Sequence, residues 1–276
     1  MQGQESSVRG NGATEAAADW VSFEIDGDVA LVGLHRPEKR NAISDRFVEA
    51  IGRAVERARA EARAAVLFGH GDHFCAGLDL AEHVEKTPIE GIHSSHRWHE
   101  IFERIQFGPI PWITAIHGAA VGGGLEIASA THIRVADETA FFALPEGSRG
   151  IFVGGGGSVH TARLMGVARM TDMMLTGRSI DARTAEAWNL VQYVVPKGAA
   201  RTRAIDLARR AATNADLSNY AVLNALPRIA EMGPREGLFV ESFIASLTAT
   251  SPEANQRLRA FLDKKAEKVA IPDTAR

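Results

Sequence analysis

Gly118-Ala-Ala-Val-Gly-Gly-Gly-Leu-Glu126 is the most informative stretch of this sequence. It follows the apolar run 112–116 and precedes Ile127-Ala-Ser-Ala, so the pattern predicts a strand, a tight turn and the start of a helix. Such a turn exposes backbone N–H groups that can stabilise an anion or a developing oxyanion. The G-x-G-x-x-G spacing of a dinucleotide-binding loop is absent. On this segment alone, Glu126 is either a functional carboxylate or a solvated helix residue.

A second loop of the same kind lies upstream, His73-Phe-Cys-Ala-Gly-Leu-Asp-Leu80. It follows an apolar run that ends near Phe68 and leads into a predicted helix at Ala81. Taken singly, it is compatible with an ordinary turn. Two such turns could point two N–H donors at one thioester oxygen, which is the geometry needed to hold an enolate.

The surrounding pattern predicts an α/β fold. Two β-rich runs, 21–25 and 29–34, are joined by Asp26-Gly27-Asp28 and predict a hairpin. Ser44 is expected to cap an amphipathic helix that runs to about Glu61. Further short apolar runs alternate with helical or Gly-rich segments, at 65–68, 112–116, 133–135 and 140–143. After about Pro196 the pattern predicts four helices, near 199–213, 216–230, 234–248 and 252–268.

Length, composition and charge indicate which classes of protein this chain can belong to. With 276 residues, 45% hydrophobic and 24% charged, the chain is expected to be globular, as one large domain or one domain with an appended helical segment. A net charge of −3 provides no overall basic field, so we expect no nucleic-acid partner. Apolar runs are too short for a membrane span, and we expect no membrane association. The single cysteine, Cys75, fits a cytoplasmic location. Residues 1–18 are small and polar and are expected to form a disordered tail.

Four motifs together resemble the enoyl-CoA hydratase/isomerase (crotonase) family. They stand in the family's order and spacing, at Arg36–Ala42, Phe74–Leu80, Ile116–Glu126 and Phe142–Glu146, and the resemblance extends from about Trp20 to Val269. It implies a crotonase-like α/β spiral of repeated ββα units with a C-terminal helical subdomain. The α/β core is expected at 19–198 and a helical oligomerisation segment at 199–276. A homotrimer or a dimer of trimers is the expected assembly.

The resemblance also implies the site residues. The catalytic carboxylates match Glu126 and Glu146, and the two oxyanion donors match the backbone N–H groups of Leu78 and Gly123. Other positions match residues that bind the substrate or its CoA, some of them across a subunit boundary: Arg36, Lys39, Arg40, Ala76, Asp79, Leu80, Gly122, Phe261 and Lys264. CoA would be part of the substrate, so no separate cofactor and no metal are expected.

Two carboxylates suit the hydration of an enoyl thioester. One can activate the water and the other can protonate the α-carbon, while the thioester oxygen gathers negative charge. The sequence therefore favours an enoyl-CoA hydratase acting on an acyl-CoA thioester. A double-bond isomerase or a hydratase-lyase of the same family stays open, as does a non-catalytic CoA- or RNA-binding relative.

Several residues depart from the pattern or suggest other chemistry. Val153 stands where the family more often has a proline before the glycine run, which puts the shape of the acyl pocket in doubt. Arg149 could lower the pKa of Glu146, but we expect it to pair elsewhere on the surface. The helical patch His93, His96 and His99 has spacing that a metal site could use, yet no carboxylate or cysteine cluster accompanies it. Ser158 and His160 lack a nucleophile-elbow sequence.

Overall fold

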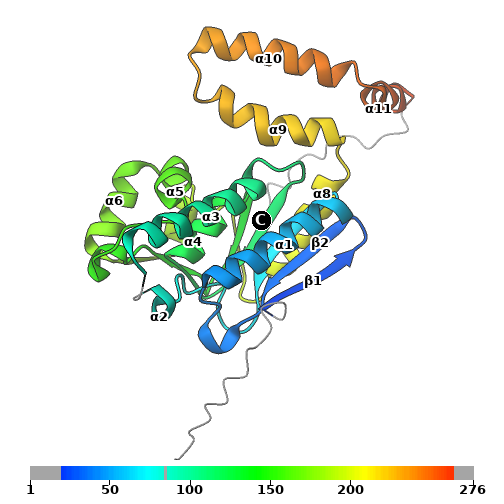
Figure 1. Cartoon of the computed structure of the whole chain (residues 1–276). Coiled ribbons are helices and arrows are strands. Elements are labelled where there is room, and N and C mark those ends of the chain that lie inside the picture. Colours follow the sequence, from blue (N-terminus) through cyan, green and yellow to red (C-terminus); the bar gives the residue numbers. More distant parts are fainter. Residues whose placement is uncertain (1–19, 84–85, 264–276) are drawn as a thin grey trace, which may run out of the picture.

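The computed structural model describes residues 20–83 and 86–263, which form two sheets surrounded by helices (Figure 1). The larger sheet has the strand order β1-β2-β3-β4-β6-β9, in which β1 and β2 are antiparallel and all other neighbours are parallel. The smaller sheet has the order β5-β7-β8. The strands are β1 (Val21–Asp26), β2 (Val29–Leu34), β3 (Ala64–Gly69), β4 (Trp112–Ile116), β5 (Ala119–Val121), β6 (Ile133–Asp137), β7 (Phe141–Ala143), β8 (Ser179–Asp181) and β9 (Tyr193–Val195).

Helices cover both faces of the larger sheet and continue beyond it. They are α1 (Asp45–Glu61), α2 (Leu80–His83), α3 (Pro88–Gln106), α4 (Gly123–Ala130), α5 (Gly157–Met165), α6 (Val167–Thr176), α7 (Ala182–Ala187), α8 (Ala200–Ala212), α9 (Asp216–Ile229), α10 (Pro234–Ala249) and α11 (Pro252–Leu262), with short 3-10 turns η2 (Pro37–Lys39) and η3 (Glu146–Arg149). Among the described helices, none combines the length and apolar character that crossing a bilayer requires.

Local signals account for the first elements. The predicted hairpin is confirmed, with Val21 paired to Leu34 and Gly27 at the turn in a left-handed conformation (φ 60°). The predicted cap is confirmed as well, because the Ser44 hydroxyl accepts a hydrogen bond from the Phe47 amide, at 3.2 Å, at the start of α1.

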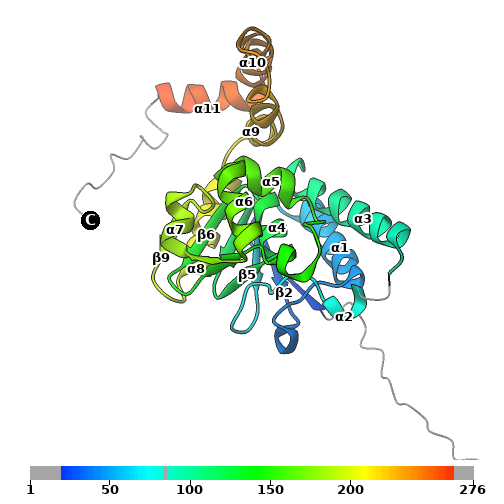
Figure 2. The same ribbon diagram turned by 90° about the vertical axis from the view of Figure 1, so that its left-hand side faces the viewer.

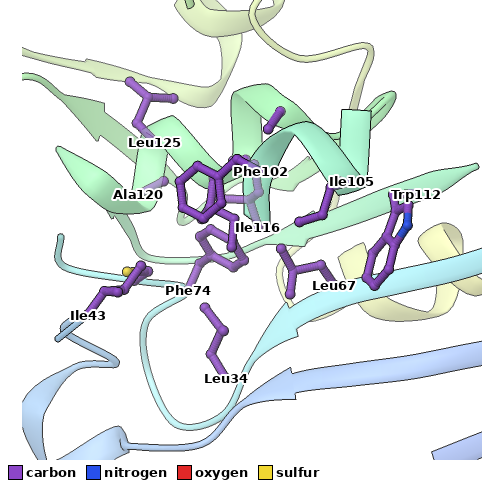
Figure 3. Packing of buried hydrophobic residues seen from close by; sticks show 14 of the residues in the cluster. Leu34, Ile43, Leu67, Phe74, Phe102, Ile105, Trp112, Ile116, Ala120 and Leu125 are labelled. Carbon is purple, nitrogen blue, oxygen red and sulfur yellow. The ribbon is translucent and has the colours of Figure 1, made fainter. Parts of the chain in front are cut away.

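Alternating side chains of the buried strands supply two separate cores. On one face, Ala30, Val32 and Leu67 pack under α1 and α3, whose apolar stripes include Phe47 and Phe102. Figure 3 shows the centre of this core, where Phe74, Phe102 and Ile116 meet Leu67 and Trp112. The opposite face is covered by α8. Its buried residues recur every three or four positions and meet the alternate strand residues, Val29, Leu31, Val66, Phe68, Ile113 and Val135.

The position of α8 changes the expected domain boundary. The four predicted C-terminal helices form as α8 to α11, yet α8 packs on the large sheet and completes its second core. The predicted helical segment 199–276 therefore begins with a helix of the α/β core. Helices α9, α10 and α11 lie at one end of that body, which α9 contacts where the Asn224 side chain donates to the Gly108 carbonyl at 3.4 Å (Figures 1 and 2). The end of the fourth predicted helix, beyond Asp263, lies outside the described residues.

Candidate active site

Two loops that follow parallel strands meet beside the small sheet. The loop after β3 runs alongside β5, where the Cys75 amide donates to the Ala119 carbonyl at 2.8 Å and the Val121 amide donates to the Cys75 carbonyl at 3.0 Å. Both loops leave the same edge of the sheet, because β3 and β4 are parallel neighbours. This pairing brings Leu78 next to Gly123, although 45 positions separate them in the chain.

The amides of Leu78 and Gly123 form a pair of open donors. A Cβ on Gly123 would lie only 3.7 Å from the Leu78 nitrogen, so the two amides are close. Gly77 allows this approach, since its φ is +96° and a Cβ there would lie 2.6 Å from the Val121 carbonyl oxygen. In the described part of the chain neither amide donates to a protein acceptor. Both line a cavity of about 100 Å³.

Glu126 lies on α4 and points into the same cavity. The residue is 3% exposed. Its Oε1 accepts hydrogen bonds from the amides of Gly155 (2.8 Å) and Gly157 (2.9 Å). A Cβ on Gly157 would lie 2.8 Å from the Glu126 Cγ, so that position must be glycine for the loop to close on the carboxylate. Burial, together with a smaller effect of neighbouring Glu146, raises the pKa of Glu126 to about 7, although both amides favour the ionised form.

Glu146 faces this cavity from η3. The residue is 6% exposed, and its Oε1 lies over Gly122, where a Cβ would come within 2.7 Å. Its Oε2 is buried without a hydrogen-bond partner among the described residues. Burial raises the pKa of Glu146, and nearby Arg149 opposes that rise. No donor stabilises the charged form at the Glu146 Oε2, whereas the two amides at Glu126 stabilise its charged form and offset part of the effect of its burial.

The structure corrects the expectation for Arg149. It is exposed at the surface, as expected, but it lines the cavity and makes no ion pair with any residue the structure describes. Its charge instead acts on Glu146, where it opposes the rise in pKa that burial causes. The expected pairing elsewhere is wrong because the turn of η3 holds Arg149 on the same side as Glu146.

Apolar side chains form much of the remaining wall, from Leu78, Leu80, Trp98, Ile151, Phe152 and Val153. Sequence reasoning did not assign Trp98, whose ring lies 2.7 Å from where a Gly123 Cβ would be and 2.8 Å from a Gly155 Cβ. It also did not assign the amides of Gly155 and Gly157. The signal for these was the glycine run 154–157, which sequence analysis noted only because Val153 stands before it in place of the family's more common proline.

Six of the nine predicted CoA-binding residues fall into two groups in the structure. Ala76, Leu80 and Gly122 line the cavity with the four predicted catalytic positions. Arg36, Lys39 and Asp79 form an ion-pair cluster instead, with the Asp79 Oδ2 2.9 Å from Arg36 and 3.2 Å from Lys39.

The ion-pair cluster restrains the side chain of Arg36. Arg36 is 7% exposed and its guanidinium also lies 4.4 Å from the centre of the Trp20 ring, so its cation is already engaged. Lys39 is half exposed and Arg40 is exposed, and their contact with a CoA phosphate stays a prediction. Phe261 is exposed on α11, and Lys264 lies outside the described residues.

Asn41 joins the loop that carries these basic residues to the loop that carries Leu78. It is fully buried, and its Nδ2 donates to the carbonyls of His70 and His73, both at 2.9 Å, and of Phe74 at 3.1 Å. Its Oδ1 accepts from the Arg36 amide at 2.8 Å. The buried Asn41 side chain thus fixes the start of the loop that carries Leu78.

The other chemical candidates of the sequence do not converge on this cavity. His96 and His99 have ring centres 6.3 Å apart, and no group of three or more His, Cys, Asp or Glu in the described residues is placed to hold a metal. Ser158 is exposed whereas His160 is buried, and burial lowers the pKa of His160 to about 4. Cys75 is buried, which raises its pKa to about 12 and makes it a poor nucleophile.

Comparison with known proteins agrees with this geometry. The family model for enoyl-CoA hydratase/isomerase matches residues 24–269. The chain is 32% identical to enoyl-CoA hydratase EchA19 of Mycobacterium tuberculosis, over 88% of this chain and 93% of that protein. It is 31% identical to 2,3-dehydroadipyl-CoA hydratase of Escherichia coli, over 86% and 93%. A crystal structure from Rhodopseudomonas palustris, assigned to an enoyl-CoA hydratase, superposes with a TM-score of 0.88 at 49% identity, over 92% and 98%.

Proposed function

This chain belongs to the enoyl-CoA hydratase/isomerase family, and from that premise we propose that it adds water across the 2,3 double bond of an enoyl-CoA thioester. The observation that carries the proposal is the shared cavity. Two buried carboxylates, Glu126 and Glu146, face the same space as the acceptor-free amides of Leu78 and Gly123. An isomerase of this family would need only one base, so two carboxylates around one space favour hydration.

The proposed roles follow from the environments of the carboxylates. Glu126, whose charged form is favoured by two amides, takes a proton from water as the water oxygen bonds to C3. Electron density moves onto the thioester oxygen, where the amides of Leu78 and Gly123 stabilise the enolate. Glu146, with its unpartnered oxygen, gives a proton to C2. A proton exchanged between the two carboxyl groups then restores the starting state, and their titrations belong to the pair.

Substitution of each carboxylate tests the proposal. Glu126→Gln and Glu146→Gln keep size and polarity but remove proton exchange, so each should lose roughly 100- to 10,000-fold in kcat while still binding CoA esters. Hydration is followed as the loss of conjugated-enoyl absorbance over a panel of short, long and aromatic enoyl-CoA thioesters, with the product identified by its mass. The double variant should be far less impaired than the product of the two single losses.

Glu24→Gln provides the matched control, because it makes the same chemical change on an exposed position of β1. If only one of the two site variants were impaired, and the product were a shifted double bond or a cleaved chain, the isomerase or lyase alternative would take the place of hydration. Near wild-type rates in both would exclude the two-carboxylate mechanism, and a wild type that hydrated none of the thioesters would leave only a CoA-binding role.

We also propose that the chain forms a homotrimer or a dimer of trimers. Support comes from the helices beyond the α/β body, which carry large exposed apolar side chains: Val222, Leu226, Leu238, Phe239, Phe243, Leu247, Leu258, Phe261 and Leu262. In such an assembly Phe261 and Lys264 would approach the CoA site of a neighbouring subunit. Four further statements stay predictions: the protein is cytoplasmic, it holds no resident cofactor, it binds no nucleic acid, and it does not associate with a membrane.

A further inference from the structure

One peptide group connects helix α3 to the carboxylate of Glu126. This peptide joins Gly154 and Gly155: its carbonyl accepts a hydrogen bond from the Ser95 hydroxyl at 2.5 Å, and its N–H donates to the Glu126 Oε1 at 2.8 Å. A peptide is planar, with its carbonyl and N–H on opposite sides. Whatever fixes the direction of the Gly154 carbonyl therefore also fixes the direction of the Gly155 N–H.

The chain by itself holds this peptide weakly. Both residues that flank it are glycines, whose backbone dihedrals have the widest range of any residue, so the peptide can rotate at little cost. Rotation would turn the carbonyl oxygen towards Glu126 and replace a favourable contact with the carboxylate by a repulsive one. Glycine is nonetheless required at 155, since a Cβ there would lie 2.8 Å from the Trp98 ring and 3.2 Å from the Glu126 Oε2.

Ser95 is well placed to hold the peptide because α3 is itself anchored. Thr87 and Glu90 form a capping box at the helix start, and Asp45 binds both Ser94 (2.5 Å) and Arg97 (2.7 Å) on either side of Ser95. The hydroxyl therefore projects from a fixed point. A hydrogen bond to a carbonyl also polarises the amide and strengthens its N–H as a donor.

We propose that Ser95 is a positioning residue, which holds the Gly154–Gly155 peptide with its N–H towards Glu126 and so keeps this carboxylate able to take a proton from water. The proposal rests on the proposed hydratase function for its catalytic meaning, but the contact itself does not. Other titratable or charged groups near this region are Glu146 and Arg149 from η3, His99 from α3, and His160 and Arg163 from α5, and all of them are retained when Ser95 is replaced. The His99 Nε2 itself lies 3.4 Å from the Ser95 Oγ.

The test compares Ser95→Ala with the wild type across pH 5.5–9.5. Without the hydroxyl the peptide is free to turn, the charged form of Glu126 loses stabilisation, and its pKa rises. Activity that needs ionised Glu126 should then fall roughly five- to tenfold at pH 6 but less than twofold at pH 9. Ser95→Thr, which keeps the hydroxyl, should restore the wild-type profile, and Ser95→Cys, with its weaker donor, should fall between the two.

A direct titration of the Glu126 carboxyl carbon by ¹³C NMR separates this proposal from the hydratase assignment. A higher midpoint in Ser95→Ala supports the positioning role even if no enoyl-CoA is hydrated. An unchanged midpoint, or an activity loss equal at every pH, overturns it. Ser242→Ala is the control: it removes an exposed serine hydroxyl that likewise donates to a backbone carbonyl, that of Phe239 at 2.7 Å, but on α10, so it should not move the Glu126 midpoint.

Discussion

At the scale of single residues, Glu126 reduces the stability of the fold that holds it. Its pKa is about 7 in the folded chain against 4.5 for the free side chain, so between these values the folded state binds more protons than the unfolded state. The free energy of unfolding therefore falls as pH rises from about 4.5 to 7. The loss is on the order of 3 kcal/mol, because burial of the charge is only partly offset by the two amides.

Glu126→Gln should accordingly be more stable than the wild type at pH 8, by about 2–3 kcal/mol, and nearly equal to it at pH 4.5. Urea unfolding at the two pH values measures the difference, with Glu24→Gln as the exposed control. A stability gain that is independent of pH would contradict the explanation, because it would have to come from packing rather than from ionisation.

At the scale of elements, the position of the Leu78 amide depends on an irregular loop, which a second loop, residues 36–41, holds in place. Asn41 joins these loops through three donated hydrogen bonds and one accepted bond, and the ion pair between Arg36 and Asp79 joins them again next to Leu78. Desolvation acts to raise the pKa of Asp79, but Lys39 and Arg36 outweigh it and lower that pKa. The two loops therefore behave as one unit.

Asn41→Asp tests this unit with almost no change of shape. The new carboxylate would face three carbonyl oxygens that the amide nitrogen now satisfies, so we expect a loss of about 2–4 kcal/mol in the free energy of unfolding. We also expect a fall in kcat larger than any change in KM, because the displaced loop carries the Leu78 amide that would hold the enolate in the proposed mechanism. Asn255→Asp, at an exposed position on α11, is the matched control. Equal stability of the two variants would exclude the anchoring role.

At the scale of the whole molecule, helices α9 to α11 leave an apolar surface uncovered. Phe239 and Phe243 pack edge to face with ring centres 4.8 Å apart, yet each is more than 60% exposed. A surface of this kind is costly in water unless a partner covers it. The smallest closed assembly expected from the family has three copies of the 29.7 kDa chain.

Light scattering at micromolar concentration should give the mass of a trimer or of twice a trimer. Phe239→Glu combined with Phe243→Glu should shift the mass towards the monomer, because the proposed assembly would bury the two added charges. Glu241→Gln, an exposed substitution on the same helix, is expected to leave the mass unchanged. A wild-type monomer at this concentration would rule out the proposed assembly.

The amino-acid order by itself determined the features that depend on neighbours in the chain. The hairpin around Gly27, the Ser44 cap and the strand–turn–helix loops all follow from short-range rules of backbone geometry, hydrogen bonding and periodicity. The spacing of four motifs was also enough to identify the family and to single out Glu126 and Glu146.

Only the tertiary structure decided the environments of those side chains. Amides of the glycine run 154–157 donate to Glu126, about 30 positions away in the chain. Asp79 forms an ion pair with Arg36, and α8 packs in the core instead of with the helical segment. These outcomes depend on contacts between segments far apart in the chain, whose free energies come from burial and desolvation. Because a pKa or an ion pair is set by the groups that surround a charge in space, it could not be derived from residue order alone.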